Sequence, residues 1–206
     1  MSNDWLLRAL EESRARGFLG PGAIGPQIEH SAGFAQCWQE ISGLPPASLL
    51  DLGSGGGLPG LVLAERWGCR TVLVDSMVKR MNFLRETLEW PGAPKDVVVI
   101  IERAEVLARD PSLESSFDLV TARSFGPPSV VAECAVRFLR LGGTLVVSEP
   151  PEDDGTRWNQ KVLRTMGLED RGRIRHGAAF RVLSKVSATP KELPRAVGVP
   201  AKRPLF

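Results

Sequence analysis

The sequence predicts an α/β protein with a doubly wound, Rossmann-like sheet of seven strands and an N-terminal helical extension. Short apolar, β-branched runs alternate with helical segments between residues 48 and 168, which is typical of a parallel sheet covered by helices on both faces. A glycine-rich turn follows the first run directly. Two further runs, 169–176 and 179–186, have the pattern of an antiparallel pair and bring the number of expected strands to seven.

The composition is that of an ordinary cytoplasmic domain rather than a secreted or membrane protein. The 206 residues are 43% hydrophobic and 24% charged, a normal balance for a globular protein. No apolar stretch of about 18 residues occurs, and the first residues lack the pattern of a signal peptide. Three scattered cysteines, Cys37, Cys69 and Cys134, favour reduced thiols over disulfides or zinc. With only His30 and His176, a histidine-rich metal site is excluded.

Residues 1–47 are expected to form a helical extension ahead of the sheet. Apolar residues at helical spacing predict a helix over 4–16, and Asn3 or Asp4 is placed to cap it. A loop rich in glycine and proline then leads to a second helix, expected over 27–42. We expect both helices to pack on the sheet domain or to shape its substrate side.

The segment around which the rest is arranged is Leu49–Gly60, with the sequence LLDLGSGGGLPG. A predicted strand over 48–52 ends in it, and a helical run over 58–67 begins in it. Because glycine has no Cβ, its backbone can adopt positive φ and approach a ligand closely. The free N–H groups at the start of the following helix carry partial positive charge and suit an anionic or polar ligand.

Two ligand fingerprints fit this turn, and a third interpretation is a structural turn without a ligand. Gly55, Gly57 and Gly60 have the spacing of the dinucleotide fingerprint. Asp51, Gly53 and Gly55 have the spacing of the S-adenosylmethionine (SAM) fingerprint, in which an acid ends the strand just before the glycines. An acid is unfavourable beside a pyrophosphate but suits the methionine ammonium group, so the sequence favours SAM.

A second acid, Asp75, ends the next predicted strand, 70–75. It lies about 20 residues beyond the glycines, where mononucleotide-binding sheets hydrogen-bond the ribose hydroxyls. The alternative is a cap for the helix expected over 76–90, and both roles can hold together. That helix is expected to turn Met77, Phe83, Leu84 and Leu88 inward and Lys79, Arg80 and Arg85 outward.

Functional residues are also expected after the third and fourth strands, 96–101 and 117–121. Ala104 and Glu105 follow the third strand on the edge where ligands bind in open parallel sheets, so they are placed to meet an adenine. The alternative for them is a short helix start. Arg123 follows the fourth strand, where an arginine is costly without an anionic partner. A SAM carboxylate or an RNA phosphate would serve, and the alternative is an ion pair with a neighbouring acid.

The remaining elements complete the predicted sheet domain. They are a helix from Pro127-Pro128 to Leu139, a turn at Gly142-Gly143, a fifth strand over 144–148 that ends at Glu149 on the ligand edge, and a last helix over 154–167. Together with the closing antiparallel pair, they account for the chain up to residue 186.

Positive charge gathers at the carboxyl-terminal end of the chain. Residues 171–206 hold nine basic residues and one acid, a net charge of +8, against −6 for residues 1–170. A basic end on an acidic body indicates a polyanionic partner. Period-2 alternation puts Arg171, Arg173 and Arg175 on one face of a strand, where the alternative is a solvated edge that prevents aggregation. The proline-rich tail is expected to lack regular structure.

Several separated motifs can be compared with known families. They are DLGSGGGLPG at 51–60, VDSMVKRMNFL at 74–84, Arg-Ala-Glu at 103–105, Arg-Ser-Phe at 123–125 and PRAVGVPAKRPL at 194–205. Together they resemble the RsmG family, the bacterial 16S rRNA guanine-N7 methyltransferases once called glucose-inhibited division protein B. The likeness covers roughly residues 48–206, and Glu29-His30 matches the family's Arg-His helix more weakly.

The resemblance implies the class I SAM-methyltransferase fold, SAM as cofactor, and methyl transfer to a guanine N7 in 16S rRNA of the 30S subunit. The family's SAM contacts, carried over position by position, fall on Gly53, Leu58, Ala104, Glu105 and Arg123. Asp51, Gly55, Gly57 and Asp75 complete the expected cofactor site, and Arg123 is the expected catalytic residue. Guanine N7 has a free lone pair, so this chemistry requires no general base.

The resemblance also extends to residues expected to contact RNA. Lys79 and Arg80 match a Lys-Arg pair of the family, and Lys202 matches its tail lysine. With the basic end of the chain, the expected RNA-binding residues are Lys79, Arg80, Arg171, Arg173, Arg175, Arg195, Lys202 and Arg203. One segment departs from the family: Ser148-Glu149-Pro150 stands where a Leu-Lys-Gly segment is usual, so a glutamate replaces a lysine near the target.

The predicted organisation is a helical extension over 1–47, a methyltransferase domain over 48–187 and a basic tail over 188–206, in a monomer. Two other functions stay open. One is a SAM methyltransferase that acts on a small molecule or a protein, with Glu149 recognising a cation. The other is a non-enzymatic RNA-binding relative. A nicotinamide oxidoreductase is the least favoured interpretation.

Overall fold

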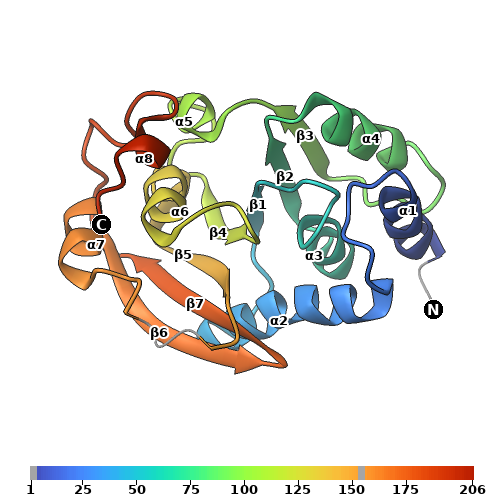
Figure 1. Ribbon diagram of the computed structural model, residues 1–206, viewed down its shortest axis with the longest axis horizontal. Coiled ribbons are helices and arrows are strands. Elements are labelled where there is room, and N and C mark those ends of the chain that lie inside the picture. The colour runs from blue at the N-terminus through green and yellow to red at the C-terminus, as the bar shows by residue number, and fades with distance from the viewer. Residues whose placement is uncertain (1–3, 153–155) are drawn as a thin grey trace.

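The protein is built on one mixed seven-stranded sheet with helices on both faces (Figure 1). A computed structural model describes residues 4–152 and 156–206. The strands are β1 (Ser48–Leu52), β2 (Arg70–Asp75), β3 (Val97–Ile101), β4 (Phe117–Ala122), β5 (Leu139–Glu149), β6 (Leu168–His176) and β7 (Ala178–Lys185). They lie in the order β3-β2-β1-β4-β5-β7-β6. β1 to β5 are parallel, whereas β7 is antiparallel to β5 and β6, which confirms the predicted doubly wound sheet and its closing pair.

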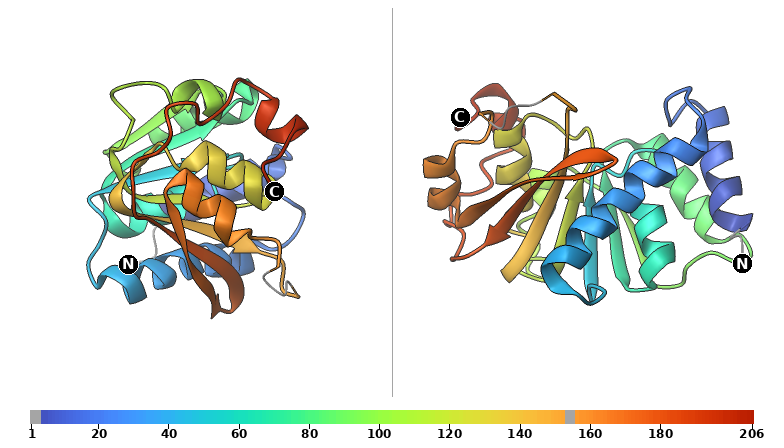
Figure 2. Two further views of the ribbon diagram at one scale, coloured as in Figure 1. Left: turned by 90° about the vertical axis from the view of Figure 1, so that its left-hand side faces the viewer. Right: turned by 90° about the horizontal axis from the view of Figure 1, so that it is seen from below.

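The helices divide between the two faces of this sheet (Figure 2). They are α1 (Asp4–Ala15), α2 (Ile24–Ser42), α3 (Gly60–Trp67), α4 (Val78–Leu88), α5 (Ala104–Leu107), α6 (Pro128–Ala135), α7 (Gln160–Met166) and α8 (Val199–Lys202). Strand side chains alternate between the faces: Leu50 and Val120 pack with α5, α6 and α7, whereas Leu49 and Leu119 pack with α2 and α3. Both sets are buried, as expected for parallel strands covered on each side.

The N-terminal helical extension packs against the sheet domain, which confirms one of its expected roles. α1 buries Trp5 and Leu10 against apolar residues of α3 and α4, and the Trp5 indole donates a hydrogen bond to the Thr87 carbonyl over 2.7 Å. Arg16, just after α1, forms an ion pair with Glu86 at 2.8 Å. α2 lies across the strands and contacts β5, β6 and β7, as the right-hand view of Figure 2 shows.

Several element boundaries differ from the prediction. α2 begins at Ile24 rather than at residue 27, because Pro26 is tolerated within the first turn of a helix. α4 begins at Val78, so Met77 is half-exposed instead of facing inward. α6 ends at Ala135, and residues 136–138 form a turn instead of its last helical residues. β5 begins at Leu139 and includes Gly142-Gly143, which were predicted as a turn, with an irregular register opposite Phe117–Leu119.

The carboxyl-terminal segment is more ordered than predicted. The expectation of no regular structure is wrong, because Val199–Lys202 forms α8 and Pro200 is buried. Leu193 and Phe206 pack against the same apolar core as α6. Buried apolar contacts of this kind hold the chain in place despite its prolines.

The last predicted helix is shorter than expected. The sequence places its start at residue 154, but α7 covers only Gln160–Met166, and residues 153–155 lie outside the described residues, as does Asn3. The Asn159 side chain caps α7 by accepting hydrogen bonds from two backbone N–H groups. Among the helices of the described ranges, none is long and apolar enough to cross a membrane.

Candidate functional site

The glycine turn after β1 has the open backbone that its sequence predicts. Gly53 and Gly55 have φ of +77° and +52°, in the left-handed region that favours glycine. The Gly53 N–H donates a hydrogen bond to the Val74 carbonyl over 2.8 Å, which ties the turn to β2. A Cβ on Gly53 would lie 2.7 Å from the Phe125 ring, so glycine is required at this position for two reasons. The turn therefore brings bare backbone to the carboxyl edge of the sheet.

Asp75 ends β2 beside this turn. One oxygen of its carboxylate accepts a hydrogen bond from the Gly55 N–H over 3.0 Å, and the other accepts one from the Met77 N–H over 2.9 Å. The carboxylate is thus held in one orientation, and each oxygen keeps a second lone pair for a ligand. Its bond to Met77 serves the turn before α4, but the N-cap of that helix is Met77, so the capping role is not borne out. Asp75 also lines a cavity, and its contact with a ribose stays a prediction.

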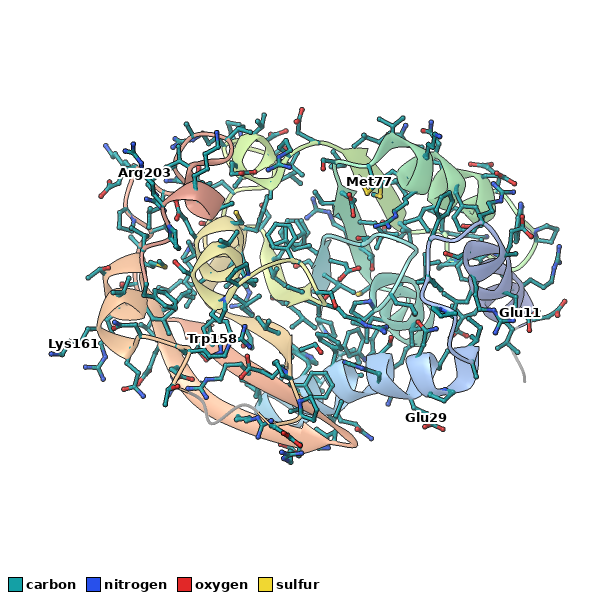
Figure 3. The ribbon with its side chains drawn as sticks, in the orientation of Figure 1. Glu11, Glu29, Met77, Trp158, Lys161 and Arg203 are labelled. Carbon is teal, nitrogen blue, oxygen red and sulfur yellow. The ribbon has the colours of Figure 1, made fainter. Side chains whose placement is uncertain are left out.

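A cavity of about 560 Å³ lies over the carboxyl ends of β1, β2 and β4. Its walls come from the glycine turn, the end of β2, the start of α5, the loop after β4 and one side of α6. Figure 3 shows Met77 at the end of the sheet where β2 leads into α4. Among the predicted site residues, the wall contains Gly53, Gly55, Leu58, Asp75, Arg80, Ala104, Glu105 and Arg123. Ligand sites in open α/β sheets occupy this same edge.

Arg123 is one of the arginines that line this cavity, and it follows β4. Its side chain is half-buried, and among the residues that the structure describes its Nη1 atom has no hydrogen-bond partner. Burial lowers the pKa of Arg123, and the negative charge of Asp51 opposes this shift. The chain turns at once after it, at Ser124 with φ of +56°, which is uncommon for a residue with a side chain. A buried polar atom without a hydrogen bond is costly, so the Nη1 atom of Arg123 favours an anionic or polar ligand here.

Ala104 and Glu105 begin α5, so the alternative of a short helix start is confirmed, and their contact with an adenine stays a prediction. Both residues are buried and line the cavity. Burial disfavours the charge of Glu105, but hydrogen bonds from Gly198 and Arg103 outweigh it and lower the pKa of this carboxyl. The Gly198 N–H donates to Glu105 Oε1 over 2.9 Å. Glu105 is therefore ionised and already engaged by the carboxyl-terminal segment.

Asp51 and Gly57 lie behind the cavity wall rather than on it. Asp51 is fully buried, and its carboxylate accepts hydrogen bonds from the Thr121 hydroxyl at 2.7 Å and the Gly60 N–H at 3.1 Å. Burial raises the pKa of Asp51 to about 6. Gly57 has φ of +106° and leaves no room for a Cβ beside Leu61. Both residues shape the turn from within, and their contact with a cofactor stays a prediction.

Sequence reasoning missed the part of the wall that comes from distant segments. Phe18, Leu19 and Gly20 line the cavity from the loop between α1 and α2. Ser13 holds this region to the glycine turn by donating a hydrogen bond to the Gly56 carbonyl over 2.8 Å. Ala201 lines the cavity from α8. The glycine and proline content of the N-terminal loop indicated only a break between helices, because composition does not specify what a loop contacts.

The three arginines of β6 do not share one face, which corrects the prediction. A register shift between Asp170 and Gly172 inserts Arg171 as an extra residue, so the period-2 alternation fails there. Arg171 bonds the Ser184 hydroxyl at 3.1 Å, whereas Arg173 and Arg175 donate to the carbonyls of Pro150 and Pro151. These two arginines therefore hold the chain that follows β5.

The other basic residues differ in whether their side chains are exposed or bound to other residues of the protein. Arg80 lines the cavity close to Gly55, and Lys79, Lys202 and Arg203 are exposed. Arg195 forms a two-pronged ion pair with the fully buried Glu133, with distances of 2.8 and 2.7 Å. Its guanidinium is thus committed to the protein itself.

The carboxyl end of β5 is closed rather than open to the cavity. Glu149 is buried, and its Oε1 accepts a hydrogen bond from the Trp158 indole over 2.9 Å. The neighbouring Ser148 hydroxyl lies 2.8 Å from His30 Nε2 of α2. Burial, assisted by the charge of Arg123, lowers the pKa of His30 and favours its neutral form. Glu149 is not among the residues of the cavity wall, so the prediction that β5 ends on the ligand edge holds for the backbone but not for this side chain.

Comparisons with known proteins agree with this geometry. The family model described as rRNA small subunit methyltransferase G matches residues 27–160. A protein of that name from Thermotoga petrophila is 36% identical over 77% of this chain and 72% of its own length. Another, from Dictyoglomus thermophilum, is 32% identical over 77% of this chain and 68% of its own.

Solved structures extend the likeness to the fold. The cofactor-bound structure of Rv0187 from MTB has a TM-score of 0.61 and 20% identity, and covers 89% of this chain and 90% of that protein. The antibiotic-resistance methyltransferase Kmr has a TM-score of 0.56 and 18% identity, over 74% of this chain and 93% of its own. The fold is that of the class I SAM methyltransferases.

Proposed function

The chain belongs to the rRNA small subunit methyltransferase G family, and from that premise we propose that it methylates N7 of a guanine in 16S rRNA. It is a SAM-dependent methyltransferase, like the family to which it belongs. The observation that carries the choice of substrate is Arg123, whose half-buried guanidinium lines the cavity with Nη1 unpaired among the described residues. An rRNA supplies both an anionic backbone and a base that can enter this cavity.

The cavity fits SAM in size and in chemistry. Its volume of about 560 Å³ lies within the roughly 300–1,000 Å³ of small-molecule sites. Asp75 would hold the ribose hydroxyls, and Ala104 and Glu105 would hold the adenine. The bare backbone of Gly53 and the Arg123 guanidinium would hold the methionine end. When bound, SAM supplies a methyl group that its sulfonium charge activates.

The protein's part in the reaction is positioning. Guanine N7 attacks through its own lone pair, so no side chain has to remove a proton. This agrees with the site, where Asp75 already accepts two backbone hydrogen bonds and Glu105 accepts one from Gly198. Holding the base in line with the methyl group is worth about 7–11 kcal/mol when the geometry is good. Arg123 would contact both the methionine end and the target base, and would set that geometry.

The target base has to be presented unstacked, because a base within a helix cannot reach the cavity. Lys79 and Arg80 lie on α4, Lys202 ends α8, and Arg203 follows it. Both helices contribute to the cavity wall, through Arg80 and Ala201. We assign these basic residues to the RNA phosphates, a contact that weakens as salt rises. The enzyme would act as a monomer in the cytoplasm, on the small ribosomal subunit or its rRNA.

The test is methyl transfer from labelled SAM to 30S subunits, and to free 16S rRNA, that lack this modification. Nucleoside mass spectrometry of the product identifies the methylated base. 7-Methylguanosine at a single site is the expected result. SAM binding without RNA methylation would redirect the proposal to a small-molecule or protein acceptor. Absence of both SAM binding and methyl transfer would indicate a non-enzymatic relative.

A further inference from the structure

The segment from Pro190 to Arg203, here called the strap, crosses the domain on its way to the cavity. Arg137 donates a hydrogen bond to the Leu193 carbonyl over 2.6 Å, and Arg109 donates one to the Pro194 carbonyl over 2.6 Å. Beyond the strap, the Leu205 N–H donates to the Ser129 hydroxyl over 2.8 Å. Figure 1 shows α8, the helical part of the strap, beside α6, and the two helices are in contact. The strap is thus bound to the domain at several separate points.

The central attachment is the pair of Arg195 and Glu133. Glu133 lies on α6 and is fully buried. Its Oε1 accepts hydrogen bonds from the backbone N–H and the Nε of Arg195, both over 2.8 Å, and its Oε2 accepts one from Nη2 over 2.7 Å. Such fork-like pairing fixes direction as well as distance. Removing the arginine would leave a buried carboxylate uncompensated.

The next residues of the strap reach the cavity itself. Gly198 adopts φ of +77°, and in this conformation its N–H points to Glu105 Oε1 at 2.9 Å. Ala201, three residues on, forms part of the cavity wall. On α6, Cys134 follows Glu133 directly and lines the same cavity. The pair therefore joins two wall segments, one from the strap and one from α6, close to the residues assigned to the adenine.

We propose that Arg195 and Glu133 are positioning residues for SAM: their buried ion pair docks the strap so that Gly198 orients Glu105 and Ala201 closes the adenine side of the cavity. This inference rests on the proposed function, because it takes the cavity as the cofactor site. It assigns to Arg195 a role in cofactor affinity in place of the phosphate contact expected from its charge.

The experiment is calorimetric titration of the full chain with S-adenosylhomocysteine. Arg195→Met should weaken binding about tenfold, because side chains that share one network are energetically coupled. Arg195→Lys keeps the charge but loses the fork, so its loss should be smaller. The matched control is Arg164→Met in α7, an exposed arginine that lies outside both the strap and the cavity wall, and binding should equal that of the parent.

Steady-state kinetics separate positioning from a general loss of structure. Arg195→Met should raise KM for SAM about tenfold while kcat at saturating SAM stays within about twofold of the parent value. Circular dichroism checks that each variant is folded. If Arg195→Met does not fold, the same measurements are made on Arg195→Lys. Parent-like binding by a folded Arg195 variant overturns the strap's role and leaves the proposed function intact. A parent chain that does not bind S-adenosylhomocysteine overturns the proposed function and the inference together.

Discussion

The carboxyl ends of β1 and β2 and the carboxyl end of β5 lie on one edge of the sheet, but they differ in what they offer a ligand. The first region is open: Gly53 and Asp75 face a cavity with backbone and carboxylate groups. The second is closed, because Trp158 binds Glu149 and two arginines bind the carbonyls of Pro150 and Pro151. The edge of a parallel sheet is thus a place for a site, and the neighbouring side chains decide where the site is.

The largest effect is expected at Arg123, because its Nη1 atom lines the open region without a hydrogen-bond partner among the described residues. Arg123→Ala should lower kcat/KM for methyl transfer by about 10²–10³, the usual loss for a preorganised charge at a reacting centre. The measurement is single-site methylation of unmodified 30S subunits. Arg164→Met is the control for loss of a positive charge. A variant that binds SAM and methylates as well as the parent would remove Arg123 from the mechanism.

Asp51 provides a second test, of stability, just beneath the open region. Its pKa is raised to about 6 by burial, so the unfolded carboxyl ionises at lower pH than the folded one. As pH rises from about 4 to 7, the unfolded state loses its proton first, and Asp51 should cost up to about 3 kcal/mol of folding free energy. Urea unfolding of the parent and of Asp51→Asn at both pH values checks this. A difference between the two proteins that does not change with pH would contradict it.

Asp75→Asn tests the ribose contact with a smaller change. The amide oxygen can keep one of the two backbone hydrogen bonds, but the charge is lost, so affinity for S-adenosylhomocysteine should fall about tenfold. Titration calorimetry measures this directly. Unchanged affinity with a lower melting temperature would indicate that Asp75 serves only the turn before α4.

The smallest effect is expected in the closed region, with Glu149→Gln. Glutamine keeps an acceptor for the Trp158 indole, and the side chain is absent from the cavity wall. Methyl transfer should therefore change by less than about twofold, because the bond to Trp158 is kept and the amide replaces Oε2, which has no hydrogen-bond partner among the described residues. A loss of tenfold or more would place Glu149 at the substrate and break the contrast between the two regions.

Much of the site could be predicted because it is local in sequence. Asp75 ends a strand, Gly53, Ala104 and Arg123 come shortly after one, and parallel strands bring their carboxyl ends to one edge. The rest depended on contacts between distant segments. Leu19 and Ala201 reach the cavity from opposite ends of the chain, and neither carries a pattern that specifies its neighbours.

The sequence alone determined the sheet, because apolar runs and glycine turns specify strands and turns through interactions within a few residues of the chain. It also determined the family, because the diagnostic motifs are continuous stretches of the chain. Only the tertiary structure decided which charges are free. Arg195 is paired with Glu133, Arg171 is displaced by a bulge, and Glu149 is covered by Trp158. The availability of a charged group depends on what packs beside it, and that is a property of the folded chain.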